Sequence, residues 1–171
     1  TPIGGGGNKH RPFSGTFDGQ GHTVSGIYMK SDGYYLGFFG VLNMKGTSTI
    51  KNFKLVNSYF ECTRTEALGS EIDGLGSIAG QGAGVLDTVY SDAIVVSATR
   101  NVGGFIGNQR QKESPLTVTN CWFNGSVTGT QWMGGVVGYV DYYVAYTNIS
   151  DCLITADFTS TMTEGNSLVG G

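Results

Sequence analysis

A short box of glycine and hydrophobic residues, here called the glycine box, recurs along this chain and constrains its fold more than any other feature. Four copies are complete and a fifth is begun: LGFFG at 36–40, LGSIAG at 75–80, VGGFIG at 102–107, MGGVVG at 133–138 and LVGG at 168–171. One glycine of each box stands at positions 37, 76, 103, 134 and 170, in steps of 39, 27, 31 and 36 residues. Repeats of about 20–50 residues are typical of solenoids, in which one repeat is too short to bury its own apolar face.

A second motif, here called the strand box, lies between the glycine boxes. Its copies are VSGI at 24–27, IKNF at 50–53, LDTV at 86–89, VTNC at 118–121 and ISDC at 149–152. When these copies are aligned, similar residues fall into three columns. The columns are Val24, Ile50, Leu86, Val118 and Ile149; then Ile27, Phe53, Val89, Cys121 and Cys152; then Met29, Leu55, Ser91, Phe123 and Ile154. Aligned apolar columns predict repeats that stack in register over a continuous core.

The repeat predicts an all-β fold, a right-handed parallel β-helix of about five coils that forms one unit over residues 1–171. Alternation of period two favours strands, no helical period is visible, and right-handed crossovers are the rule for parallel strands. The chain has 29 glycines, and we expect those at fixed positions to serve tight turns and close backbone approach, so that the coil turns corners where a Cβ would clash. Residues 64–73 and 108–114 are expected to form loops outside the coil. A β-sandwich is the competing fold, but it needs no register between distant segments.

The glycine boxes, alternating with strands of the Ile-x-Asn-Cys type, resemble the GLUG-motif repeats of bacterial surface proteins. The opening FSGTFDGQGHTV at 13–24 is similar to the first coil of such domains, so the resemblance covers nearly the whole chain. It implies a secreted or cell-surface protein, often adhesin-like, in which the repeat is a scaffold. The copy at 75–80 departs from the pattern at Ser77 and Ala79, and we expect looser packing there.

Composition excludes several partners. Charged residues make up 13% of the chain and the net charge is −3, without the clustered Lys and Arg that nucleic acid requires. No window of about 18 apolar residues is present, so no membrane span is expected. Because the chain opens with Thr1, we expect a mature or excised piece of a longer extracellular protein. We also expect further coils, a capping domain or a second copy to cover the end at Gly171.

The sequence shows no catalytic machinery. Glycoside hydrolysis needs two carboxyls about 5–9.5 Å apart, and no such pair is visible. Asp18 with His22 is the best acid and base pair, but Asp-Gly-Gln-Gly-His is more typical of a turn. No motif for a metal or cofactor is present, so none is expected. The alternative function is a carbohydrate-active β-helix, a polysaccharide lyase or glycoside hydrolase, with catalytic residues outside this chain or only weakly visible.

The three cysteines do not form a disulfide framework or a zinc motif. Cys121 and Cys152 share a column, so we expect them to be reduced and packed in the core, although a disulfide or metal pair is the functional alternative. Cys62 is expected to be free or partly exposed.

Exposed aromatic residues are the best candidates for binding. Such side chains can stack on sugar rings or anchor a protein partner, although they can also fold back on the coil. The candidates are Trp122, Trp132, Tyr142, Tyr143 and Tyr146. We therefore expect a non-catalytic structural or adhesive segment that binds a glycan or protein partner. A third hypothesis is an ice-binding module, because Thr-x-Thr recurs at 128–130 and 159–161.

Overall fold

The chain folds as an all-β solenoid. The computed structural model describes residues 1–5, 11–43, 45, 47–65, 73–110, 113–163, 165 and 167–170. These residues contain no helix, and therefore none that could cross a membrane. Every pairing between their strands is parallel.

Four parallel sheets run along the solenoid. The first outer sheet contains β1 (Gly15–Asp18), β6 (Ser48–Val56), β10 (Gly84–Ser91), β14 (Pro115–Thr119) and β19 (Tyr146–Ser150), with β2 (Thr23–Ser25), β15 (Trp122–Phe123) and β20 (Leu153–Ile154) beyond a bend. The second outer sheet contains β3 (Tyr28–Ser31), β7 (Tyr59–Cys62), β11 (Ile94–Ser97), β16 (Ser126–Gly129) and β21 (Asp157–Ser160).

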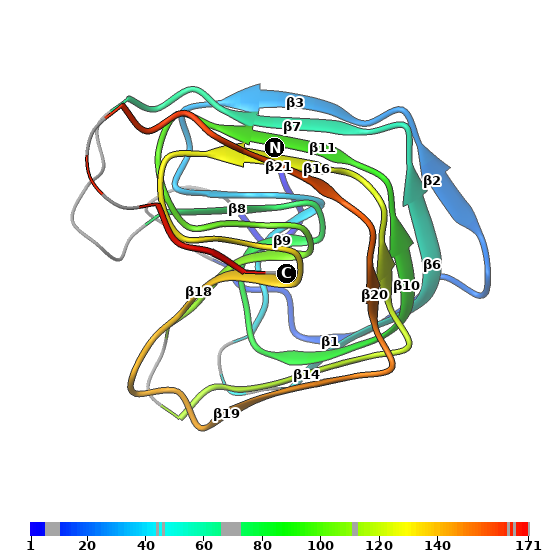
Figure 1. The fold of residues 1–171 in the computed structure, drawn as a ribbon. Helices are drawn as coiled ribbons and strands as arrows, with labels where there is room; N and C mark the ends of the chain where they lie inside the picture. Colours follow the sequence, from blue (N-terminus) through cyan, green and yellow to red (C-terminus); the bar gives the residue numbers. More distant parts are fainter. Residues whose placement is uncertain are drawn as a thin grey trace.

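The glycine boxes form two inner sheets. One contains β4 (Tyr35–Leu36), β8 (Gly74–Gly76), β12 (Val102–Gly103), β17 (Met133–Gly134) and β22 (Val169–Gly170), and the other contains β5 (Phe39–Val41), β9 (Ala79–Gln81), β13 (Ile106–Gln109) and β18 (Val137–Val140). In Figure 1 these sheets run through the middle of the coil, with the outer sheets above, to the right and below.

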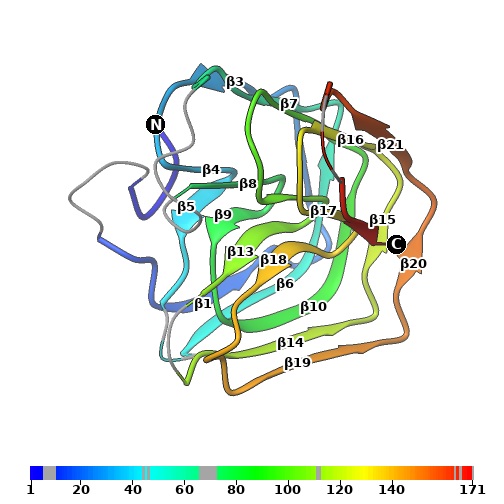
Figure 2. The same cartoon turned by 60° about the vertical axis from the view of Figure 1, so that its left-hand side comes forward.

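The coil is right-handed, as the sequence predicts. The C-terminal coil lies nearest the viewer in Figure 1, and the chain runs anticlockwise as it advances toward the viewer; Figure 2 separates the two ends. Three of the sheets have five strands along their main path and the β5–β18 sheet has four. The described residues therefore make about four complete turns and begin a fifth, slightly fewer than the five coils expected.

The box glycines allow the two inner sheets to pack at backbone contact distance. A Cβ on Gly107 would lie 2.3 Å from the backbone nitrogen of Leu75, and one on Gly138 would lie 2.5 Å from that of Val102. No side chain fits between strands that approach so closely. Close backbone approach, one of the two roles expected of these glycines, is confirmed, whereas the box glycines are absent from the residues with positive φ. Their role is close approach.

The corner of the first outer sheet is made mainly by polar residues in the left-handed conformation. In each coil, one such residue bends the chain between two short extended segments. Asn and Asp adopt the left-handed conformation more readily than most residues. The corner residues are Gln20 (φ 51°), Asn52 (φ 55°), Thr88 (φ 56°), Asn120 (φ 53°) and Asp151 (φ 52°). This column explains why the third position of the strand box is polar or small.

The predicted apolar columns are confirmed from the second coil onward. Ile50 pairs with Leu86, Leu86 with Val118, and Val118 with Ile149. The alignment of the first coil is wrong: Val24 pairs with Leu55, while Phe17 pairs with Ile50. Phe53 is buried as predicted. The looser packing expected at Ser77 and Ala79 is not found, because residues 77–79 are fully buried and the Ser77 hydroxyl donates a hydrogen bond to the carbonyl of Gly104.

The cysteines are free thiols. Cys121 is buried in the core and Cys152 is half-buried beside it. Cys62 is also buried, so the expectation that it is partly exposed is wrong, although it is free. Of the expected loops, residues 66–72 and 111–112 lie outside the described residues. Asn108 and Gln109 belong to buried β13 rather than to a loop.

Candidate functional site

An open groove follows the outer corner of the first outer sheet. Its volume is about 640 Å³, and we call it the corner groove. It crosses four successive coils, so a ligand in it would run along the axis of the solenoid. The lining residues are Asp18, Gln20, Gly21, Asn52, Phe53, Lys54, Thr88, Val89, Tyr90, Asn120 and Trp122.

The strand register places the most distinctive groove side chains in one outward-facing column. Lys54 on β6 pairs with Tyr90 on β10, and Tyr90 pairs with Trp122 on β15. Adjacent strands lie about 4.8 Å apart, so these three side chains follow one another along the axis at roughly that spacing. Their inward neighbours Phe53 and Val89 are buried and form the apolar floor.

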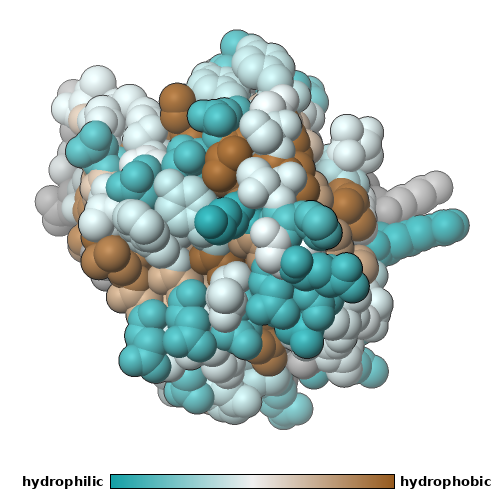
Figure 3. All heavy atoms as spheres, turned by 90° about the vertical axis from the view of Figure 1, so that its right-hand side faces the viewer, coloured by the Kyte–Doolittle hydropathy of each residue, from teal (hydrophilic) through white to brown (hydrophobic). Residues whose placement is uncertain are grey.

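The aromatic pair is held in place and remains accessible. The rings of Tyr90 and Trp122 meet edge to face, with centroids 5.1 Å apart, and Trp122 is 43% exposed. The indole Nε1 of Trp122 donates a 2.9 Å hydrogen bond to the hydroxyl of Thr155, which in turn donates to Asn124. Figure 3 shows this side of the molecule as a mixture of hydrophilic and hydrophobic residues. The groove thus offers a fixed aromatic surface, and it is also lined by the charged side chains of Asp18 and Lys54.

Hydrogen bonds fix the polar side of the groove. The Asp18 carboxylate accepts hydrogen bonds from the backbone N–H of Gln20 and the amide of Asn52, and it lies 3.5 Å from the Lys51 ammonium. These groups lower the pKa of Asp18, with the Gln20 hydrogen bond as the largest cause. Two coils later, Asn120 donates to the carboxylate of Asp87 in the same way. The polar groups are therefore pre-oriented for binding.

The surroundings of Asp18 favour its ionised form. Its hydrogen bonds lower the pKa of the carboxyl, whereas a general acid near neutral pH needs a raised pKa. Asp18 instead organises a turn, because the backbone N–H of His22 also closes onto the Gly19 carbonyl. Within the described ranges, no group of three or more His, Cys, Asp and Glu could hold a metal ion.

The five aromatic residues singled out in the sequence do not form one site. Trp122 lines the corner groove. Trp132 packs against Tyr139, with ring centroids 5.1 Å apart, and the guanidinium of Arg100 lies 4.9 Å from its ring. It is half-buried and supports the coil.

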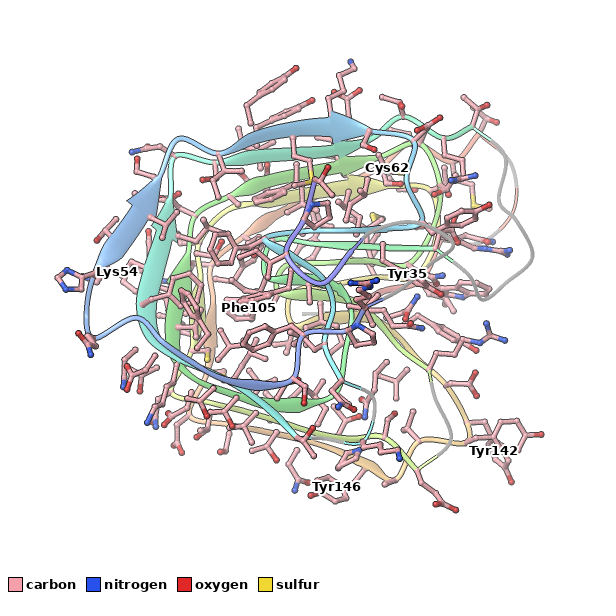
Figure 4. The ribbon with its side chains drawn as sticks, turned by 180° about the vertical axis from the view of Figure 1, so that it is seen from behind. Tyr35, Lys54, Cys62, Phe105, Tyr142 and Tyr146 are labelled. Atoms are coloured by element: carbon pink, nitrogen blue, oxygen red, sulfur yellow. The ribbon has the colours of Figure 1, made fainter. Side chains whose placement is uncertain are left out.

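The three tyrosines follow β18, well away from the corner groove. Tyr142 and Tyr143 contact each other at the tip of a turn, with Tyr142 90% exposed, and Tyr146 begins β19. In Figure 4, Tyr142 lies at the lower right and Tyr146 at the bottom, whereas Lys54 lies on the left.

Sequence reasoning missed Lys54, Tyr90 and the corner amides as groove residues. A signal for them was present, because each residue of the outward column directly follows an aligned core position. Tyr90 follows Val89, and Trp122 follows Cys121. Residues that share this offset must share a face of the sheet.

Comparison with known proteins supports the fold. No protein-family model matches the chain. It is 32% identical over 89 residues to a protein of Evansella cellulosilytica named "Putative Gly-rich membrane protein", and this match spans 52% of the chain but only 9% of that protein. A crystal structure described as "a putative immunoglobulin A1 protease from Bacteroides ovatus" superposes with a TM-score of 0.56 at 18% identity, covering 97% of this chain and 71% of that one. This likeness shows a shared β-solenoid fold.

Proposed function

We propose that the chain is a non-catalytic, structural or adhesive segment of an extracellular surface protein and that its corner groove binds a glycan chain. The observation that carries the proposal is the accessible Tyr90–Trp122 pair in an open groove edged by amides and by Lys54. The repeats supply the rigid frame on which this groove is built.

The groove chemistry suits a sugar polymer. An aromatic ring presents a large, rigid apolar surface on which the C–H face of a sugar can stack. The side chains of Asn52, Asn120 and Lys54 can donate hydrogen bonds to hydroxyls. A mainly apolar surface with a few oriented polar groups is the usual composition of a small-molecule site. Its direction along the axis favours an extended chain over a compact ligand.

The setting is supported by the similarities. The E. cellulosilytica protein is named "Putative Gly-rich membrane protein", and the B. ovatus structure is described as "a putative immunoglobulin A1 protease". The GLUG-like boxes point the same way, toward a surface scaffold in a larger protein. These similarities support the proposal that the segment lies at the cell surface or outside the cell.

Binding can be tested with soluble polysaccharides. A neutral β-glucan, a mannan and polygalacturonate are titrated into the protein by isothermal calorimetry, and the best ligand is then tested on Trp122→Ala and Tyr90→Ala. Loss of a central aromatic anchor costs about 2 kcal/mol or more, so affinity should fall at least about tenfold.

The matched control is Trp132→Ala, which removes a tryptophan from another part of the solenoid. Its affinity for the glycan should stay near that of the unmodified protein. An absence of binding to all three polymers, or an equal loss in both tryptophan variants, would overturn the proposal.

A further inference from the structure

The carboxylates at the edge of the corner groove already have partners within the protein. Asp18 and Asp87 stand on either side of Lys51 in the register of the first outer sheet, and the Lys51 ammonium lies 3.5 Å from Asp18. The Asp87 carboxylate accepts hydrogen bonds from the hydroxyl of Thr88 and the amide of Asn120. These negative groups therefore do not require a cation from a ligand.

Lys54 differs from them, because no carboxylate of the described residues forms an ion pair with it. Its backbone is fixed, since Phe53 and Leu55 on either side are buried in the core and its N–H donates a 3.1 Å hydrogen bond to the His22 carbonyl. The residue is exposed, and Figure 4 shows it on the left of the molecule. The groove therefore carries a positive charge that lacks a counter-charge within the described part of the chain.

The position of Lys54 relative to the aromatic pair determines which part of a ligand it would meet. Lys54, Tyr90 and Trp122 occupy the same outward column in three successive coils. With about 4.8 Å between strands, Lys54 lies roughly 10 Å along the axis from Trp122, and Tyr90 lies between them. A sugar chain that stacks on the two rings and continues along the groove would bring its next units over the Lys54 ammonium.

A neutral chain and an acidic chain differ at this point. A neutral chain would displace water from the ammonium without supplying an opposite charge, and the loss of hydration costs free energy. A carboxylate or sulfate would replace that water with a charge-assisted hydrogen bond, which is about twice as strong as a neutral one. Resting on the glycan binding proposed above, we infer that the ligand of the corner groove is an acidic glycan, whose anionic group pairs with Lys54 while adjacent sugars stack on Tyr90 and Trp122.

The chemistry of lysine admits either kind of anionic sugar. Its ammonium is a point charge with three donors and no fixed plane, so it does not distinguish a carboxylate from a sulfate. A single-stranded nucleic acid is also anionic and stacks on aromatic rings, but it needs a groove with many cations along its backbone. Lys54 is the only cation among the described residues that line this groove, and the amides of Asn52 and Asn120 suit sugar hydroxyls, so a glycan is favoured.

The test compares polymers that share a backbone and differ in charge. Polygalacturonate and its methyl ester form one such pair, and dextran sulfate and dextran form another. Each polymer is titrated into the full chain by isothermal calorimetry in calcium-free buffer. We expect an acidic polymer to bind about fivefold or more tightly than its neutral counterpart, and the pair that shows this preference identifies the anionic group. The preference should disappear when the ionic strength rises from about 0.01 M to about 1 M, because the screening length falls from about 30 Å to about 3 Å.

Substitutions test whether Lys54 is the partner of the anionic group. Lys54→Gln removes the charge, so it should lower the affinity for the acidic polymer to that for the neutral one and leave the latter unchanged. Lys54→Arg keeps the charge and should keep the preference. The matched control is Lys30→Gln, which removes a lysine of the second outer sheet that pairs with Glu61 at 2.9 Å, and it should bind as the unmodified protein does. A thermal melt checks that each variant is folded.

Several outcomes would overturn the inference. Equal binding of acidic and neutral polymers, unaffected by Lys54→Gln, would leave the aromatic groove as a site for neutral glycans. An equal loss in Lys54→Gln and Lys30→Gln would show attraction by overall charge alone. Tighter binding of an oligothymidylate than of either acidic polymer would identify single-stranded nucleic acid as the ligand. An absence of binding to every polymer would overturn glycan binding itself, and this inference with it.

Discussion

The substitution Gly107→Ala tests the packing that distinguishes this solenoid from a hollow coil. Its added methyl would lie 2.3 Å from the Leu75 nitrogen and 2.6 Å from the Gly74 carbonyl carbon. Ordinary contact begins at 3.4 Å, so the strands must separate by about 1.1 Å (3.4 − 2.3). Both obstacles are backbone atoms in a paired strand, which cannot rotate away as a side chain can. A gap of 0.5–1 Å already forfeits about a quarter to a half of a contact's dispersion energy.

The cost should therefore reach the upper part of the usual overpacking range of about 1–3 kcal/mol. For a chain of this size, about 3 kcal/mol corresponds to a fall of roughly 6–12 °C in the melting temperature. Urea unfolding followed by tryptophan fluorescence, together with calorimetry, measures both quantities.

Gly170→Ala is the matched control, because its Cβ would have no atom within 4 Å. Both substitutions remove the same backbone freedom from the unfolded chain, so their difference isolates the steric term. Equal stabilities of the two variants would refute the close packing of the inner sheets.

Three further outcomes follow from the core and the groove. Phe53→Ala should lower the free energy of unfolding by about 3–5 kcal/mol, and an unchanged melting temperature would remove Phe53 from the core. Burial raises the pKa of the Cys121 thiol to about 12, so iodoacetamide at pH 8 should label half-buried Cys152 before Cys121; rapid native labelling of both, or a crosslink between them, would contradict this. Because the pKa of Cys121 lies above the ordinary 9.0, its contribution to stability is present below pH 9 and is lost as the pH rises toward 12. Polygalacturonate and neutral glycans should not be cleaved, and release of reducing ends or unsaturated products that Asp18→Ala abolishes would show that the chain is an enzyme.

The sequence predicts the outer sheets well from the second coil onward, because stacked repeats must carry similar core residues at equivalent positions. Equivalent core positions of neighbouring repeats must pair, so Ile50, Leu86 and Val118 align without gaps. The first coil fails for a specific reason. Val24 lies seven positions after Phe17 (24 − 17), whereas Leu55, its partner in the second coil, lies five positions after Ile50 (55 − 50). The two extra residues fall in the turn, and an alignment that matches apolar residues alone slips across them.

The inner sheets could not be predicted in the same way. Glycine is selected both where φ is positive and where backbones approach closely, and the residue type alone does not separate these causes. The spacing within a glycine box suits either a corner or a hairpin-like turn. Only the facing of Gly107 against Leu75, and of Gly138 against Val102, identifies close approach as the cause. That facing depends on how the box folds back inside the coil, which no local pattern specifies.

The same reasoning separates the scaffold residues of the corner groove from those proposed to bind a ligand. The corner amides, such as Asn52 and Asn120, are accounted for by the left-handed bend, so their presence alone says little about a ligand. The residues of the outward column need no left-handed backbone conformation, and they differ from coil to coil. They are Thr23, Lys54, Tyr90, Trp122 and Leu153. Trp122 in particular leaves 43% of its surface in solvent and contributes little to the core. Its removal should therefore weaken ligand binding much more than it lowers stability, and that contrast separates a binding residue from a structural one.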